Sequence, residues 1–120
     1  MFINIIDVII SMTKLLESVK KELLSWPSVT AEPHRFGGTE FRINEREMGH
    51  IHGDRVADIP FPMNIRTELI KSGRVSPHHV LPQSGWTSYW IEKGEEDVPA
   101  IIELFRMRYE QLKPKIKHGG

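Results

Sequence analysis

The segment "TEFRINEREMGHIHGDRVADIPF", residues 39–61, decides the fold because it contains three short strand-like runs separated by tight turns. In the first run, residues 39–43, apolar and charged residues alternate, as they do in a half-buried strand. Residues 44–46 then predict a hairpin turn, with "EMGHIHG" as the returning strand. The pair Gly53-Asp54 predicts a second turn into a third run, whose two prolines indicate a sheet edge or a strand end. Strands joined by such short turns must be antiparallel.

Helical periodicity flanks this segment on both sides. Apolar residues recur at helical spacing over Met12–Trp26, over Asn64–Lys71 and again over Ile101–Leu112. An extended run, "SVTAEPHRF", precedes the first hairpin, and the aromatic run "WTSYWIE" predicts a strand between the last two helices. The order α-β-β-β-β-α-β-α predicts an α+β two-layer sandwich. Its antiparallel sheet should have four or five strands, with the helices mainly on one face.

Length and composition predict one globular domain over residues 1–120. Residues 1–11 are expected to be an N-terminal extension, because their apolar run is too short for a bilayer, and residues 113–120 a basic tail. Sixteen basic and sixteen acidic residues cancel, so we expect neither a nucleic-acid nor a membrane partner. The absence of cysteine excludes disulfides, thiolate metal sites and cysteine nucleophiles, and it fits a cytoplasmic location.

Two histidines two residues apart form the most distinctive chemical feature. Residues i and i+2 of a strand point to the same face, about 6.6 Å apart along the chain. His50 and His52 therefore present two imidazoles side by side, with Asp54 just beyond them. The hairpin register predicts Glu40 on the neighbouring strand across from this pair, and His79, in a later proline-flanked loop, can reach the same surface.

This histidine cluster has three interpretations. Histidines with a carboxylate can hold zinc, iron or manganese in an open site, here at His50, His52 and His79. Without a metal, histidines near their ordinary pKa can act as general acid or base on a bound small molecule. In the third interpretation the histidines are structural residues that hydrogen-bond to Glu40, Asp54 or Asp58, which is the commonest role of such a pair. Whether the chain is an enzyme stays open at this point.

Two further residues are candidates for contacting a ligand. Trp86 begins the aromatic strand and can stack on an aromatic ring, although core packing is the more frequent role of tryptophan. Arg74 can bind a carboxylate or a phenolate, although a solvated surface position is the more frequent role. The predicted ligand contacts are Asp54, Glu40, Arg74 and Trp86, beside the proton-transfer candidates His50, His52 and His79.

Three stretches resemble the small prokaryotic proteins that carry the luciferase domain, which is named for the luciferases of luminous fungi. They read "WPSVTAEPHRFGGTEFRINEREMGHIHGDRVADIPFP", "HHVLPQSGWTSYWI" and "EEDVPAIIELFRMRYE", within a resemblance that runs from about Leu15 to Leu112. The segment "REMGHIH" is similar to an Arg-Glu-x-x-His-x-His segment of the fungal enzymes. A downstream Gly, His and Leu of those enzymes are matched here by Gly73, His79 and Leu81.

This resemblance implies oxygenation of a hydroxylated pyrone by molecular oxygen, without flavin or metal. Oxygen reacts directly with an electron-rich enolate or phenolate, so the protein must take up a proton, hold the anion and keep the pocket dry. The implied ligand is an enolic or phenolic small molecule, with His50, His52 and His79 transferring protons rather than binding metal. The alternative is a non-catalytic ligand-binding or interaction domain in which these histidines are structural. A second likeness, through "GWTSYWI" and the helix ending near "RYEQL", is to the YjbR-like α+β proteins and concerns the fold.

Overall fold

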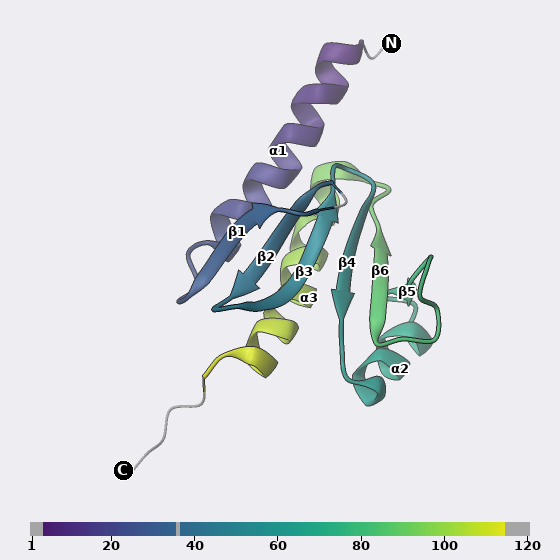
Figure 1. Ribbon diagram of the computed structural model, residues 1–120. Coiled ribbons are helices and arrows are strands. Elements are labelled where there is room, and N and C mark those ends of the chain that lie inside the picture. Colours follow the sequence, from purple (N-terminus) through teal and green to yellow (C-terminus); the bar gives the residue numbers. More distant parts are fainter. Residues whose placement is uncertain (1–3, 36, 115–120) are drawn as a thin grey trace.

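The computed structural model describes residues 4–35 and 37–114, with the side chains of residues 7–13 left outside the description (Figure 1). The described part contains an antiparallel sheet, three α-helices and one short 3-10 helix. In chain order the elements are α1 (Ile5–Leu23), β1 (Val29–Pro33), β2 (Thr39–Ile43), β3 (Arg46–His52), β4 (Val56–Pro60), α2 (Met63–Lys71), β5 (Ser76–Pro77), β6 (Trp86–Trp90), η1 (Gly94–Asp97) and α3 (Val98–Leu112).

The sheet has the strand order β1-β2-β3-β4-β6-β5, and every neighbouring pair is antiparallel. The predicted α+β fold with an antiparallel sheet is therefore confirmed. The sheet has six strands rather than four or five, because the two-residue β5 inside the proline-flanked loop pairs with β6. Helices α1 and α3 lie on one face of the sheet, and α2 lies near the ends of β4 and β6 (Figure 1).

The core lies between the sheet and these two helices. Apolar residues at helical spacing in α1 and α3 face inward and are buried. Each such side chain contributes about 1.5–3 kcal/mol through the apolar surface that it removes from water. The largest fully buried apolar side chains are Leu15, Val19 and Leu23 of α1, Phe41, Ile43, Met48, Ile51 and Ile59 of the sheet, and Ile101, Leu104 and Phe105 of α3.

A β-bulge in β3 changes the face of the sheet to which Glu47 and Met48 point. Phe41 of β2 pairs with Gly49, but the next residue of β2 pairs with Glu47, so Met48 is the extra residue. Strict alternation would place Met48 on the same face as His50, yet Met48 is fully buried in the core. The bulge instead brings Glu47 and His50 together on the opposite face, with His50 Nδ1 2.7 Å from Glu47 Oε2. The predicted turn over residues 44–46 is also shorter, because β3 already begins at Arg46.

Glycine is required at the bulge for two reasons. The backbone of Gly49 has φ = +154°, a value that side chains disfavour. A Cβ atom at this position would lie 2.7 Å from the carbonyl oxygen of Asp58 and 3.0 Å from the ring of Phe105. Helix α3 therefore packs directly against the bulge.

Substituting Gly49→Ala should lower the free energy of unfolding by about 1–3 kcal/mol, the cost of overpacking a closely packed core. Urea denaturation would measure the change. The matched control is Gly53→Asn in the turn between β3 and β4, where φ is +55° and no atom lies within 4 Å of the added Cβ. Asparagine tolerates that backbone conformation. An equal loss in both variants would contradict the crowding of Gly49 by α3.

The chain ends bear on the predicted domain limits. Residues 5–11, within the predicted N-terminal extension, continue α1, and its side chains Ile5 and Ile6 are exposed. Lys113, the first residue of the predicted basic tail, forms an ion pair with Glu110 at 2.6 Å. Residues 1–3 and 115–120 lie outside the described residues, so both limits remain predictions. None of the described helices is long and apolar enough to cross a membrane.

Candidate functional site

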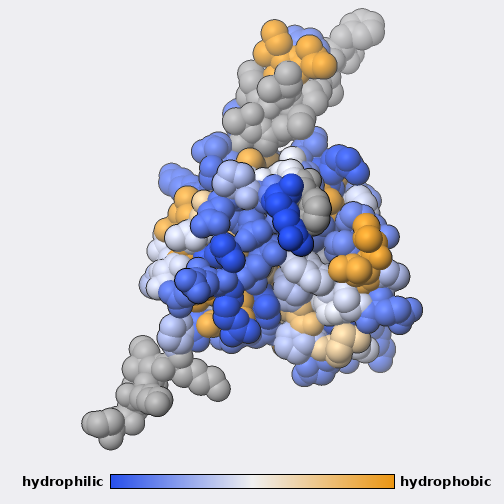
Figure 2. All heavy atoms as spheres, viewed as in Figure 1, coloured by the Kyte–Doolittle hydropathy of each residue, from blue (hydrophilic) through white to orange (hydrophobic). Residues whose placement is uncertain are grey.

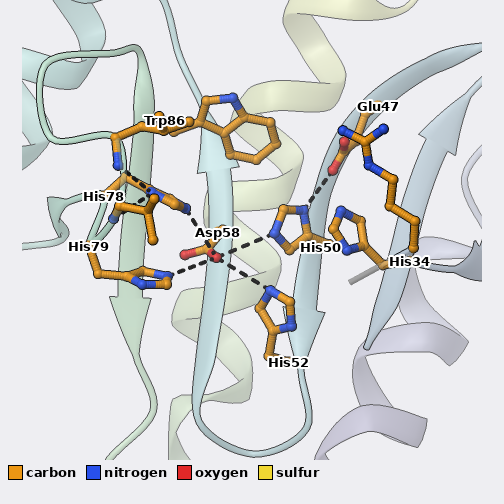
Figure 3. A pocket seen from close by; sticks show the side chains of 11 residues that line it. His34, Glu47, His50, His52, Asp58, His78, His79 and Trp86 are labelled. Atoms are coloured by element: carbon orange, nitrogen blue, oxygen red, sulfur yellow. Dashed lines mark hydrogen bonds and ion pairs between the residues drawn. The ribbon is translucent and has the colours of Figure 1, made fainter. Parts of the chain in front are cut away.

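A pocket of about 460 Å³ opens on the sheet face turned away from α1 and α3. This face is mainly hydrophilic, with hydrophobic residues gathered in small separate patches (Figure 2). Imidazole rings from three separate segments converge on the pocket together with two carboxylates and one indole ring (Figure 3). The histidines that line it are His34, His50, His52, His78 and His79.

Strand register places a row of polar residues across five strands on this face. Glu40 of β2 pairs with His50 of β3, and His50 in turn pairs with Asp58 of β4. Asp58 pairs with Ser88 of β6, and Ser88 pairs with Ser76 of β5. Directly paired residues on one face have Cβ atoms about 4.5–5.5 Å apart, close enough for their side chains to interact. The sheet thus brings together polar residues that are far apart in the sequence.

Asp58 lies at the centre of this row and is completely buried. Ser88 donates its hydroxyl hydrogen to Asp58 Oδ1 at 2.7 Å. Burial alone would raise the pKa of Asp58, but hydrogen bonds from His50 and Ser88 outweigh it and lower the pKa to about 2. Four imidazole Nε2 atoms surround its Oδ2 (Figure 3), at 3.3 Å for His50, 3.7 Å for His52, 3.4 Å for His78 and 3.5 Å for His79.

His50 bridges two carboxylates. Its Nδ1–H donates to Glu47 at 2.7 Å, and its Nε2 faces Asp58 at 3.3 Å. Burial lowers the pKa of His50, but the hydrogen bonds to Asp58 and Glu47 outweigh this effect and raise the pKa to about 9. The ring also stacks on His34, with centroids 4.0 Å apart, and lies 5.2 Å from the ring of Trp86. His50 is therefore a cation near neutral pH.

His52 and His78 differ from His50 in their charge. Burial and the positive charge of His50 lower the pKa of His52, against the opposing effect of Asp58. Burial also lowers the pKa of His78, again opposed by Asp58. The Nδ1 atom of His78 accepts hydrogen bonds from two backbone N–H groups. The pocket thus holds the charged imidazole of His50 beside the neutral imidazoles of His52 and His78, and a neutral, accessible imidazole can accept a proton from a ligand.

The structure brings together the three histidines that the sequence singled out. His50, His52 and His79 lie on one face and converge on Asp58, and Trp86 lines the same pocket. Their roles in proton transfer stay predictions. The structure also places Glu40 opposite His50, as the register predicted. The carboxylate of Glu40, however, forms an ion pair with Arg42 at 3.2 Å and lies 3.8 Å from His34.

Three of the four predicted ligand contacts, Glu40, Asp54 and Arg74, are not among the residues that line the pocket. Asp54 is in the turn beyond the end of β3 and does not line the cavity. Arg74 forms an ion pair with Glu103 of α3 at 3.2 Å and does not line the cavity either. Asp54 is adjacent to the histidines in sequence, but the antiparallel register places Asp58 opposite His50 instead.

Sequence reasoning missed several residues of this site. Asp58 was expected only as one possible hydrogen-bond partner of structural histidines, although it is an acid inside the otherwise apolar strand "VADIP". His78 had a weaker signal as the neighbour of His79. Glu47 joins His50 only through the bulge, and His34 arrives from the loop between β1 and β2. Neither of those two contacts can be read from local residue spacing.

The fold and the pocket define a small α+β domain whose open sheet face carries a histidine-rich site around one buried carboxylate. The model of the Luciferase domain family matches residues 45–108, which is more than half of the chain. The chain therefore belongs to the luciferase-domain family. The matched segment includes β3, β4 and β6, and with them all four histidines around Asp58. Neither the search of curated proteins nor the search of solved structures found a match.

The charge state of His50 predicts how stability depends on pH. A histidine whose pKa is raised from 6.5 to about 9 in the folded protein contributes stability below pH 6.5 and loses it as the pH rises through 9. The free energy of unfolding from urea denaturation should therefore fall between pH 6 and pH 9.5. This decrease should be smaller in His50→Gln and should persist in the control His52→Gln, because the pKa of His52 is lowered. A wild-type protein equally stable at both pH values would contradict the charge assigned to His50.

Proposed function

We propose that this pocket binds an enolic or phenolic small molecule and that its histidines transfer the ligand's proton, as in a cofactor-free oxygenase. The proposal depends mainly on one observation, a cationic His50 held between two carboxylates beside a neutral His52 in a 460 Å³ cavity. Membership of the luciferase-domain family supports it, because the fungal luciferases for which the family is named oxygenate a hydroxylated pyrone.

His52 is the best-placed proton acceptor. It is neutral near pH 7, and its side chain is 27% exposed, so a ligand can reach it. The O–H bond of the ligand would break, its proton would pass to the imidazole, and the electron pair would stay on the ligand oxygen. His79, whose side chain is 39% exposed, approaches Asp58 from the opposite side and is a second candidate for this step (Figure 3).

Other pocket residues suit the anion that this step would produce. The imidazolium of His50 offsets part of the negative charge of Glu47 and Asp58, which would otherwise repel an anion, and the ring of Trp86, 5.2 Å from it, offers an aromatic face for stacking. Val80 and Leu81 add apolar surface to the cavity wall. A deprotonated, electron-rich ring in a site that excludes water is the form that reacts directly with oxygen. The oxidant in this proposal is molecular oxygen, and the ligand is the compound oxidised.

The test begins with a screen of phenols and enols by ligand-detected NMR, followed by oxygen-electrode measurements on each compound that binds. His52→Gln should reduce oxygen uptake by about 100-fold or more, the usual contribution of a general base. Its free energy of unfolding should change by about 0.5 kcal/mol or less, as for other polar surface changes. The matched control is Asp54→Asn, an acid outside the cavity lining that should change neither quantity.

The outcomes of this screen separate the proposal from its alternative. Binding without oxygen uptake in the wild-type protein would favour a non-catalytic ligand-binding domain. No binding by any phenol or enol would favour structural histidines and would contradict the proposed function. Oxygen uptake that persists in His52→Gln but is lost in His79→Gln would identify His79, rather than His52, as the proton acceptor.

A metal site is the second candidate function, and one specific observation favours it. Nitrogen atoms on one tetrahedral zinc ion lie about 3.3–3.4 Å apart, given bonds of about 2.0–2.1 Å. The Nε2 atoms here lie at similar distances, 3.3–3.7 Å, from Asp58 Oδ2. The contact between His50 Nδ1 and Glu47 also resembles the carboxylate that commonly orients a metal-binding histidine. Among the described residues, two groups around this carboxylate offer ligand atoms within 4.8 Å of one another, Asp58 with His78 and His79, and His34 with His50 and His52.

Elemental analysis of tag-free protein would decide between the two functions. About one zinc, iron or manganese ion per chain, lost in His79→Gln, would support the metal site. Oxygen uptake by protein that contains no metal and is unaffected by chelators would instead support the metal-free chemistry.

A further inference from the structure

Two adjacent histidines of the pocket, His78 and His79, make different contacts. His78 is buried, and its Nδ1 lies 3.1 Å from the backbone N of Val80 and 3.0 Å from that of Leu81. A backbone N–H can only donate, so Nδ1 of His78 must offer a lone pair to both groups. His79 is more exposed, and its only contact with Asp58 runs from Nε2 at 3.5 Å.

These contacts fix the tautomer of His78. A neutral imidazole carries one N–H, so a ring that accepts at Nδ1 must carry its hydrogen on Nε2. That Nε2–H faces Asp58 Oδ2 at 3.4 Å, and the ionised carboxylate can only accept. One tautomer therefore satisfies all three partners of His78. Its Nε2 has no lone pair to offer, which leaves it unable to bind a metal or take up a proton in this arrangement.

The loop that follows His78 forms one wall of the pocket. It joins β5 to β6 and supplies His79, Val80 and Leu81 to the cavity lining. Val80 is 68% exposed and Leu81 50% exposed, so little apolar burial holds this wall in place. Strand β5 before it has only two residues. Hydrogen bonds must therefore provide much of the order in this loop.

We propose that His78 is a positioning residue that ties the pocket wall at residues 79–81 to Asp58. Through Nδ1 it fixes the turn over Val80 and Leu81, and through Nε2–H it fixes that turn to the sheet. The tie holds His79 with its Nε2 toward Asp58. Any consequence for ligand chemistry rests on the proposed function, whereas the tie itself does not.

The tautomer can be tested directly on the wild-type protein, without a ligand. Long-range ¹H–¹⁵N NMR spectra at neutral pH should show His78 with a hydrogen on Nε2 and a bare Nδ1. A spectrum with the hydrogen on Nδ1, or with both nitrogens protonated, would overturn the proposal.

Two variants test separately the two contacts of His78, the one from Nδ1 to the turn and the one from Nε2–H to Asp58. His78→Asn places an amide oxygen near the position of Nδ1 but is too short to reach Asp58. His78→Gln places an amide N–H near the position of Nε2 but offers no acceptor to the turn. Amide hydrogen exchange at Val80 and Leu81 should stay close to the wild-type rate in His78→Asn and rise by about tenfold in His78→Gln. The matched control, His79→Asn, should leave both exchange rates unchanged.

The position of His79 provides the second readout. Both His78 variants should shift the imidazole resonances of His79, because each breaks one side of the link between the turn and Asp58. Wild-type exchange rates in His78→Gln, or an equal effect in His79→Asn, would overturn the proposal. Binding of 4-nitrophenol, used as a phenolate probe, reports on the proposed function separately. If the wild-type protein does not bind 4-nitrophenol, the proposed function fails but the hydrogen bonds of His78 are unaffected. If both His78 variants bind 4-nitrophenol as the wild-type protein does, His78 does not position the ligand site.

Discussion

The structure of the pocket depends on one constraint, a negative charge buried on the open face of the sheet. An ionised carboxylate inside a protein must be compensated, since the penalty for removing it from water is several kcal/mol. Asp58 meets this requirement through Ser88 on one oxygen and a ring of imidazoles around the other. The negative charge of Asp58 therefore holds four of the five histidines that line the pocket in place.

The β-bulge links that charge to the core. It turns Met48 into the apolar layer under α3, and it turns Glu47 to the open face beside His50. The contact with Glu47 gives His50 a second carboxylate, and the hydrogen bonds to Asp58 and Glu47 together raise its pKa so that this imidazole is a cation despite its burial. The same local irregularity thus completes the core on one face and sets the charge of the pocket on the other. Because α3 crowds Gly49, core packing and pocket geometry are coupled at this point.

Local pattern predicted the fold and part of the site, and long-range register explains what it missed. Alternation and tight turns in residues 39–61 were sufficient to predict antiparallel strands, and period two placed His50 and His52 on one face. Sequence distance favoured Asp54 as a ligand contact beside those histidines, and that assignment stays a prediction. Strand pairing places Asp58, which is farther along the chain, directly opposite His50. The strand β5 was missed because a run of two residues is too short to show a pattern.

The family resemblance, now confirmed over residues 45–108, suggested a reaction type for the proposed function that residue spacing alone did not indicate. The geometry adds a division of roles among the histidines around Asp58. The contacts of His50 make it a cation, those of His78 fix a single neutral tautomer, and His52 and His79 remain the accessible rings. Such differences between chemically identical side chains arise from their hydrogen-bond partners, which only the folded chain brings together.

The charge of Asp58 thus organises the imidazoles around it. NMR titration of His50 in Asp58→Asn tests this most directly, with Asp54→Asn as the control. The pKa of His50 should fall from about 9 toward its ordinary value of 6.5 in Asp58→Asn and stay near 9 in the control. If His50 kept a pKa of about 9 in folded Asp58→Asn, the charge of Asp58 would not be what holds the imidazoles.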